Sequence, residues 1–200
     1  MQLGSAVILL GALAIVGCGA PATSDAPARP PAALASAPAC ASAPAVVVLV
    51  RHAEKASEEG DPDLSDAGRA RAARFARLFA RSSPTHLFAS DARRTQATLA
   101  PLAQATGRAV IVRPAKATNA LGEELRALEP GSLAVVAHHS NGLPTLARAL
   151  GVELSGVHEG AIAHDAYGRV FVVVLGCGDR PPRLVELGTD EPSASAPAAR

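Results

Sequence analysis

Three runs made almost wholly of β-branched and other apolar residues constrain the fold of this chain most. They lie at residues 45–50, 133–137 and 170–175. A strand with one face in water alternates apolar and polar residues, but these runs contain no polar position, so we expect strands covered on both faces. Shorter strands are predicted at residues 86–89, 109–112 and 184–187.

Helical patterns separate these strands. Ser65 can cap a helix in which Ala72, Phe75, Ala76 and Phe79 recur at helical spacing. Further helices fit residues 92–106, 118–128 and 142–150. Strands that alternate with helices predict an α/β fold, here a three-layer sandwich in which helices flank a mostly parallel central sheet.

The first 17 residues contain an apolar run that is too short to span a bilayer and that ends in small residues. Residues 15–18, Ile-Val-Gly-Cys, resemble the lipobox of bacterial lipoproteins, in which cleavage precedes a cysteine that receives diacylglycerol. We therefore expect a signal peptide at 1–17 and a lipid on Cys18 that anchors the protein to the bacterial cell envelope, at its periplasmic or outer-membrane face. The alternative is a buried N-terminal helix with an ordinary cysteine.

Residues 18–44 consist mostly of Ala, Pro and Ser and have almost no large apolar side chain, which predicts a disordered tether. Residues 189–200 have the same character and are predicted to form a disordered tail. The segment between them, residues 45–188, is then the single folded domain, a length that suits one hydrophobic core.

Two cysteines remain if Cys18 carries a lipid, and both would lie in an oxidising compartment. Cys40 precedes the predicted domain and Cys177 follows its last long apolar run. Exported thiols tend to pair, so a disulfide between them is one expectation and two free thiols are the other.

The charge balance excludes one class of partner. The chain has 19 Lys and Arg against 18 Asp and Glu, so it lacks the basic footprint of a protein that binds nucleic acid. The arginines at 69, 71, 74, 77 and 81 are interpreted as a solvated helix face rather than a phospholipid-binding face. His158 and His164 have no metal-ligand spacing around them, so no metal and no cofactor is predicted.

Polar residues directly follow three of the predicted strands, at 51–55, 90–95 and 138–141. Ligands of open α/β sheets gather at the carboxyl ends of strands, so we expect these groups at one edge. Arg51 and Arg94 supply guanidinium groups that suit a phosphomonoester dianion. A neutral imidazole at His52 is a competent nucleophile towards phosphorus, and His139 can hydrogen-bond the phosphoryl oxygens.

Two adjacent histidines end the strand at 133–137. Successive side chains of a strand point to opposite faces, so His138 and His139 are expected to point apart and not to line one pocket together. His138 is interpreted as a packed or solvent-facing residue.

The motifs resemble those of the histidine phosphatase superfamily, whose members have a phosphoglycerate-mutase-like fold. Arg51-His52-Ala53 is similar to its Arg-His-Gly signature, and Leu64-Ser65-Asp66-Ala67-Gly68 to its Leu-Thr-x-x-Gly helix start. Ser90, Arg94 and Thr98 match a Ser-x-x-x-Arg-x-x-x-Thr element, residues 137–141 resemble Gly-His-Ser-Asn, and residues 166–173 resemble a late Tyr-Asp-x-x-Phe strand. The resemblance spans about residues 46–187, with Ala53 and His138 in place of glycines.

The resemblance implies a metal-independent phosphatase, with His52 as nucleophile, His139 as second catalytic histidine, and Arg51 and Arg94 on the phosphate together with Ser140 and Asn141. The family's general acid falls loosely within residues 114–126, so Glu123 and Glu124 are candidates, as is Glu54. Expected substrates are phosphorylated small molecules or phosphoproteins. The alternative is a non-catalytic lipoprotein that binds a phosphate ligand on the same fold.

Overall fold

A computed structural model of the protein describes residues 42–189, and the lipidation candidate Cys18 and the disulfide candidate Cys40 lie outside this range. The described chain contains the following elements: β1 (Val46–Arg51), α1 (Asp66–Phe79), η1 (Ala80–Ser82), β2 (His86–Ser90), α2 (Arg93–Thr106), β3 (Val110–Arg113), η2 (Ala115–Ala117), α3 (Thr118–Arg126), β4 (Leu133–His138), α4 (Gly142–Ala149), β5 (Val157–His158), β6 (Ala161–Ile162), β7 (Arg169–Val174) and β8 (Arg183–Gly188).

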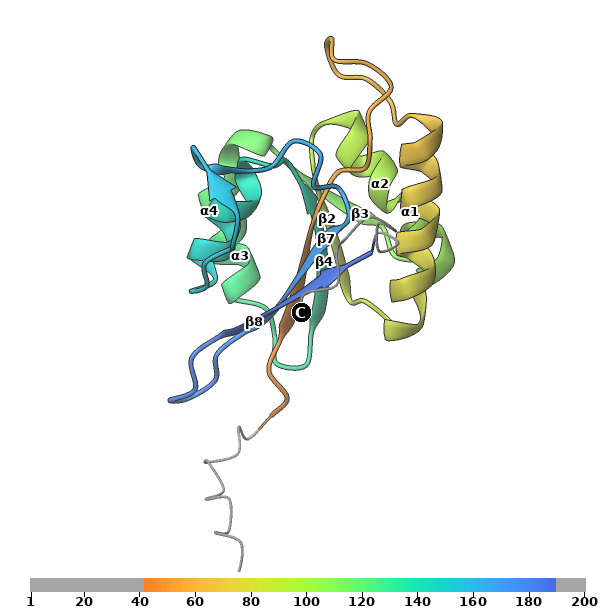
Figure 1. Ribbon diagram of the computed structural model, residues 1–200. Coiled ribbons are helices and arrows are strands. Elements are labelled where there is room, and N and C mark those ends of the chain that lie inside the picture. The colour runs from red at the N-terminus through yellow and green to blue at the C-terminus, as the bar shows by residue number, and fades with distance from the viewer. Residues whose placement is uncertain (1–41, 190–200) are drawn as a thin grey trace, which may run out of the picture. The chain divides into compact units, whose positions relative to one another are not determined.

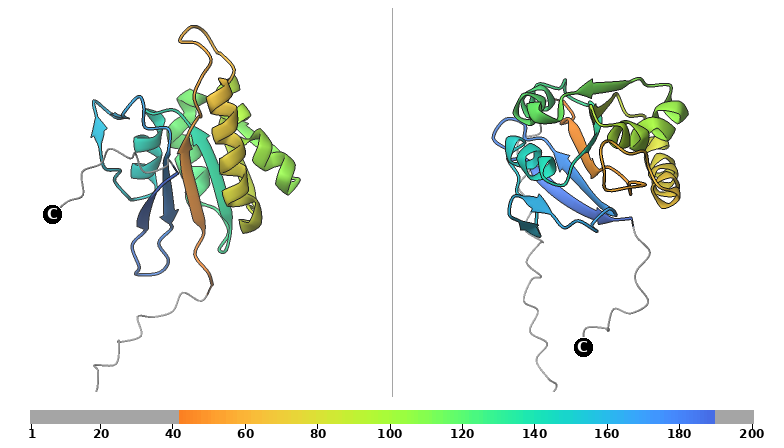
Figure 2. Two further views of the ribbon diagram at one scale, coloured as in Figure 1. Left: turned by 45° about the vertical axis from the view of Figure 1, so that its right-hand side comes forward. Right: turned by 90° about the horizontal axis from the view of Figure 1, so that it is seen from above.

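Six of these strands form one mixed sheet in the order β3-β2-β4-β1-β7-β8. The ladders from β3 to β1 are parallel, whereas β7 runs antiparallel to both β1 and β8. Helices α1 and α2 cover one face of the sheet and α3 and α4 cover the other (Figures 1 and 2). The predicted α/β sandwich is therefore confirmed, with β7 as the strand that runs against the rest.

Burial on both faces explains the uninterrupted apolar run of β1. Val47 and Leu49 pack into the core cluster that contains residues of α3 and α4. Val48 and Val50 point the other way, into the cluster that contains residues of α1 and α2. Each successive position thus meets a different apolar layer, and a polar residue at any of them would lose its hydration.

The start of α1 is held close to the chain that leaves β1. The Ser65 hydroxyl accepts the N–H of Gly68 at 3.1 Å and caps the helix, as predicted. A Cβ at Gly68 would lie 2.1 Å from the Glu54 carbonyl oxygen, so this position requires glycine. The contact places the segment after β1 directly against the helix.

One of the two cysteines in the disulfide prediction lies in the described range. Cys177 is disulfide-bonded, and its pairing with Cys40 stays a prediction because Cys40 lies outside the described range. None of the helices between residues 42 and 189 is long and apolar enough to cross a membrane.

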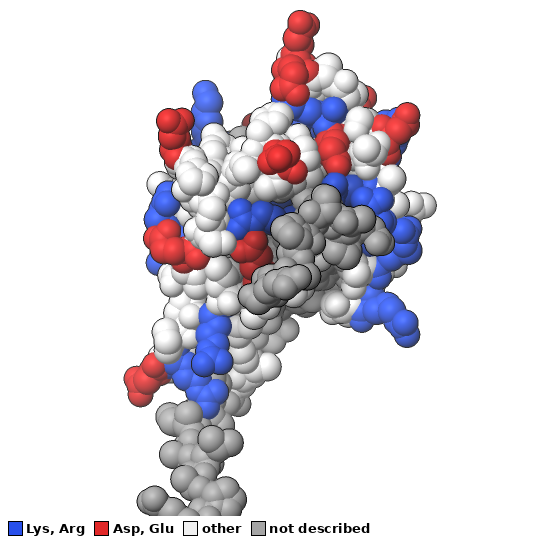
Figure 3. Space-filling model, in the orientation of Figure 1, with Lys and Arg blue, Asp and Glu red and all other residues white. Residues whose placement is uncertain are grey.

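Charged side chains are unevenly spread over the surface. Figure 3 shows Lys and Arg along the outer side of α1 and Asp and Glu at the top, around the loop between β1 and α1. Arg74 and Arg77 are exposed, in line with the predicted solvated face, but Arg71 of the same helix turns inward to Glu54.

Candidate active site

His52 follows the last residue of β1 and is only 4% exposed. Its backbone N–H still donates to the carbonyl oxygen of His138 on the neighbouring strand, at 2.9 Å. Its ring Nδ1 lies 2.8 Å from the carbonyl oxygen of Ala53. A carbonyl oxygen can only accept, so Nδ1 carries the hydrogen and Nε2 keeps a free lone pair. This tautomer is the one that a nucleophilic imidazole needs.

Burial lowers the pKa of His52 from its ordinary value of 6.5 to about 4. The hydrogen bond to Ala53 opposes this shift, whereas the positive charges of Arg51 and Arg94 add to it. Near neutral pH the ring is consequently uncharged, which preserves the lone pair on Nε2.

We predict that the His52 ring titrates with a midpoint near pH 4 rather than near 6.5. NMR titration of the histidine ring protons measures this, with His52→Gln assigning the resonance. The unfolded chain binds the proton first as pH falls below 6.5, so the stability contribution is complete above that pH and is lost as pH falls through about 4. A His52 midpoint near the ordinary value would contradict the prediction.

Arg94 and His139 meet beside His52. The guanidinium Nη2 of Arg94, in the first turn of α2, lies 3.2 Å from Nδ1 of His139, which follows β4. A guanidinium only donates, so Nδ1 accepts and Nε2 of His139 carries the hydrogen. The ring centroids of His52 and His139 are 5.5 Å apart. The structure thus brings the predicted nucleophile, the second histidine and an arginine together at one edge of the sheet.

A pair of buried hydroxyls fixes the His139 ring. Nε2 of His139 lies 2.9 Å from the Ser90 hydroxyl, which in turn lies 2.8 Å from the hydroxyl of Thr95. The Thr95 hydroxyl donates to the carbonyl oxygen of Ala92 at 2.7 Å. Both hydroxyl residues are fully buried, so a competing water does not reach them. Ser90 was predicted as a motif position, whereas Thr95 was assigned no role. The signal that could have indicated Thr95 is a hydroxyl residue in the first turn of the helix that follows the strand.

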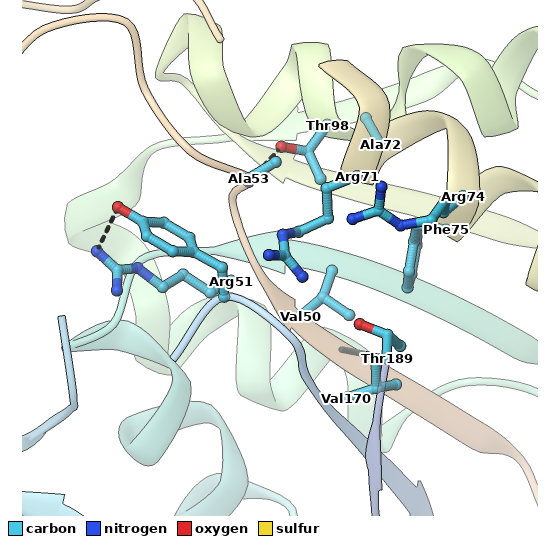
Figure 4. A pocket seen from close by; sticks show the side chains of 11 residues that line it. Val50, Arg51, Ala53, Arg71, Ala72, Arg74, Phe75, Thr98, Val170 and Thr189 are labelled. Atoms are coloured by element: carbon cyan, nitrogen blue, oxygen red, sulfur yellow. Dashed lines mark hydrogen bonds between the residues drawn. The ribbon is translucent and has the colours of Figure 1, made fainter. Parts of the chain in front are cut away.

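Arg51, the last residue of β1, is 4% exposed and is held from the far side of the site. Its Nη1 donates to the carbonyl oxygens of Ala163 and His164, and its guanidinium carbon lies 4.2 Å from the centre of the Tyr167 ring. Figure 4 shows Arg51 alongside this ring, with the 3.5 Å contact to the phenol oxygen drawn as a dashed line. Burial lowers the pKa of Arg51, and Tyr167 and Asp165 partly oppose the shift.

Both arginines retain an unused donor. The Nε–H groups of Arg51 and Arg94 are buried and have no hydrogen-bond partner among the described residues. A buried donor without a partner costs free energy, and two of them on guanidinium groups beside His52 and His139 make the site chemically suited to an oxyanion.

Asp61 is a contact that the sequence analysis missed. It lies in the loop between β1 and α1, and its Oδ1 accepts from Nη1 of Arg94 at 3.0 Å. Oδ2 of Asp61 also accepts the backbone N–H of Arg93, at 3.0 Å. Asp61 thus caps α2, because the N-cap residue Ala92 has no side chain that could do so. An anion that binds Arg94 must therefore share this guanidinium with Asp61.

The three predicted acid candidates do not line the cavity beside His139. Glu54 forms an ion pair with Arg71 at 2.7 Å, and Glu124 forms one with Arg113 at the same distance. Glu123 is exposed on α3. Asp91 is a carboxylate that the prediction overlooked. It follows Ser90, accepts the N–H of Ala115 at 3.0 Å, and exerts its charge on His138 and His139.

The expected orientation of the two adjacent histidines was wrong. His138 is buried at 2% exposure, as a packed residue, but its ring lies 5.3 Å from that of His139, and both rings line one cavity. β4 ends at His138, so His139 no longer has strand geometry and the alternation rule does not apply to it. A Cβ at Gly142 would lie 2.1 Å from Nδ1 of His138, which makes glycine necessary at the start of α4.

The residues after His139 contribute in different ways. Asn141 is exposed and lines the same cavity as His139. The carbonyl oxygen of Ser140 accepts the N–H of Ile162 at 3.1 Å, which ties β6 to the site. The β5–β6 pair was not predicted, because strands of two residues carry no periodic signal.

Within residues 42–189, no group of three or more His, Cys, Asp or Glu could hold a metal ion.

The chain is similar to known proteins in both sequence and fold. The model of the histidine phosphatase superfamily (branch 1) matches residues 47–117, which include Arg51, His52 and Arg94 and end before His139. Solved phosphatase structures match this chain over nearly their own full length. These findings support the histidine phosphatase superfamily. A search of the curated proteins found no match.

Three solved phosphatase structures have a similar fold. A mycobacterial glucosyl-3-phosphoglycerate phosphatase is 17% identical with a TM-score of 0.54, and the match covers 70% of this chain and 96% of that one. The putative phosphohistidine phosphatase SixA from Agrobacterium tumefaciens is 22% identical, with a TM-score of 0.54 over 72% and 97%. A phosphoserine phosphatase from Entamoeba histolytica is 13% identical, with a TM-score of 0.55 over 74% and 98%. At these identities the likeness shows the fold.

Proposed function

We propose that the protein is a phosphatase that hydrolyses phosphomonoesters or phosphohistidine through a covalent phosphohistidine on His52, without a metal ion. The observation that carries the proposal is the uncharged, buried His52 ring with its free Nε2, beside two guanidinium groups that each have an unused Nε–H. Phosphatases among the solved structures of this fold support it.

In the first step, Nε2 of His52 attacks phosphorus, a P–N bond forms, and the P–O bond to the leaving group breaks. The electron pair goes to the leaving oxygen, which takes a proton from water. Arg51 and Arg94 neutralise the dianion as the phosphoryl group transfers. The dianion also favours a proton from solvent on Nδ1 of His139. This nitrogen then gives up the contact from Arg94 and donates to an equatorial oxygen, while Ser90 keeps the ring in place.

In the second step, water attacks the phosphohistidine, the P–N bond breaks, and inorganic phosphate leaves with His52 neutral again. The P–N bond returns its electron pair to Nε2, and the proton of the attacking water goes to the phosphate or to solvent. Solved neighbours of this fold include a mycobacterial phosphatase in complex with inorganic phosphate and with VO3, anions of the kind that such a site accommodates.

No carboxyl group among the described residues lines the cavity beside His139. Leaving groups that need little proton assistance, such as the imidazole of phosphohistidine, should therefore react faster than alkoxides of simple alcohols.

A non-catalytic protein that binds a phosphate ligand is the second candidate, because Arg51 and Arg94 would serve binding alone equally well. Turnover separates the two. The domain is expected to release phosphate from p-nitrophenyl phosphate or phosphohistidine with the same rate in the presence of EDTA. Tight phosphate binding without turnover would favour the second candidate, and EDTA inhibition that a divalent cation reverses would move the chemistry to a metal-bound water.

We also propose that the enzyme works on the bacterial cell envelope, anchored through a lipid on Cys18. The support is the short apolar run that ends in Ile-Val-Gly-Cys, followed by the Ala/Pro-rich segment 18–44. Mass spectrometry of the mature chain tests this, because a mature protein that retains Met1 would contradict it.

A further inference from the structure

The cavity beside His139 has a volume of about 440 Å³. Its lining comes from η2, the start of α3, the end of β4 and the start of α4: Ala115, Lys116, Thr118, Asn119, His138, His139, Asn141, Gly142 and Thr145. This volume suits a small organic group rather than a macromolecule. The lining is largely polar, and within the described chain it includes one lysine and no carboxylate.

The cavity is open to the leaving group of the proposed reaction. His139 lines it and His52 does not. An in-line displacement places the leaving oxygen on the side of phosphorus opposite to the attacking nitrogen. A phosphoryl group that reacts at Nε2 of His52 and contacts His139 through an equatorial oxygen therefore has the cavity available to its leaving group.

Lys116 differs from the neighbouring cations in having no anionic partner. Arg94 is paired with Asp61, and Arg113 with Glu124. Lys116 is exposed and forms no ion pair within residues 42–189. Its ammonium group is thus available to an anion that enters the cavity.

The backbone around Lys116 is held in place. The N–H of Ala115 donates to Asp91 at 3.0 Å, and the N–H of Ala117 donates to the carbonyl oxygen of Pro114 at 2.9 Å. The Asp91 carboxylate is engaged there and does not line the cavity. The amides of Asn119 and Asn141 add uncharged donors to the lining of the cavity. The combination of one unpaired cation and several neutral donors is suited to an anionic group such as a carboxylate or a second phosphate.

We propose that Lys116 is a specificity residue that selects phosphomonoesters whose leaving group itself carries a negative charge. The inference rests on the proposed phosphatase function, since it assigns the substrate class of that same site. Simple neutral alkyl phosphates and phosphorylated amines are then poorer substrates, because they leave the ammonium group unmatched or repel it.

The test uses three phosphomonoesters of equal length that differ only at the far end: those of 3-hydroxypropionate, 1,3-propanediol and 3-aminopropanol. The expected order of kcat/KM is carboxylate, then hydroxyl, then ammonium, with about tenfold between the first and the last, as for one charge-assisted contact. A bisphosphate of 1,3-propanediol distinguishes a preference for a second phosphate from one for a carboxylate.

Lys116→Met should remove the differences in kcat/KM among the three esters, and Lys116→Glu should reverse their order. Arg126→Met removes one positive charge at the other end of α3 and should keep the wild-type order. Breakdown of the phosphoenzyme follows departure of the leaving group, so its rate constant should not depend on which of the substrates was used.

A wild-type enzyme that turns over all three esters equally, or a Lys116→Glu variant that still prefers the carboxylate, would overturn the inference and leave the phosphatase function intact. Absence of turnover with these esters, with p-nitrophenyl phosphate and with phosphohistidine would instead overturn the proposed function and the inference with it.

Discussion

Replacement of His52 by alanine is expected to abolish phosphatase turnover, with a loss of about 10⁴-fold or more, as for removal of a covalent nucleophile. In the proposed mechanism Nε2 of this ring forms the P–N bond. The hydrogen bond that Nδ1 donates to the Ala53 carbonyl oxygen leaves Nε2 unprotonated. Steady-state release of phosphate measures the loss.

A matched histidine controls for general damage. His86 begins β2 at the opposite end of that strand from Ser90, and its ring stacks on Phe88 at 5.9 Å. His86→Ala should therefore retain activity, and circular dichroism should show that both variants are folded. Acid quenching of the wild type during turnover should trap an acid-labile phosphate that His52→Ala and His52→Gln lack. Full activity in a folded His52→Ala variant would refute the covalent mechanism.

The sheet could be predicted from the sequence because burial leaves a strong record in β1, β4 and β7. Each of these strands is covered on both faces, so almost every position had to be apolar. The positions of His52 and His139 followed from β1 and β4, since polar residues directly after a strand lie at its carboxyl end. The location of a candidate site residue could thus be predicted where the residue is one or two positions from the end of a strand.

Contacts between distant segments were not predictable in this way. Asp61 lies in a loop without periodicity, and nothing in its neighbours indicates that it holds Arg94. The carbonyl oxygens of Ala163 and His164 that hold Arg51 are backbone atoms, which every residue has, so no residue type marks them. That the acid candidates do not line the cavity beside His139 could not be predicted for a related reason. The arginine partner of Glu54 is 17 residues away on α1, and ion pairs of this kind leave no local pattern.

The hydrogen-bonded hydroxyls of Ser90 and Thr95 were predictable only in part. Ser90 was recognised as a motif position, but its role depends on the rotamers of three side chains and on the turn of α2 that brings Thr95 back to it. A sequence motif records that a residue type is needed at a position. The chain of hydrogen bonds shows what the residue does there, which is to hold a proton on Nε2 of His139.

Replacement of Arg94 by alanine is expected to lower kcat/KM by about 10²-fold or more, as for loss of one positioned group that stabilises the transition state. In the proposed reaction the guanidinium neutralises the phosphoryl group, and in the structure it donates to Nδ1 of His139. Its removal would therefore weaken binding of the dianion and leave Nδ1 of His139 without its hydrogen-bond donor.

Arg93 supplies a control that removes the same charge one residue away. Its side chain is exposed and pairs with Asp63 at 2.7 Å, so it does not reach His139. Arg93→Ala should leave kcat/KM close to the wild-type value, whereas Arg94→Lys should recover only part of the loss, because an ammonium group keeps the charge without the planar fork. If Arg94→Ala were as active as Arg93→Ala, the phosphoryl group would have to bind elsewhere on the domain.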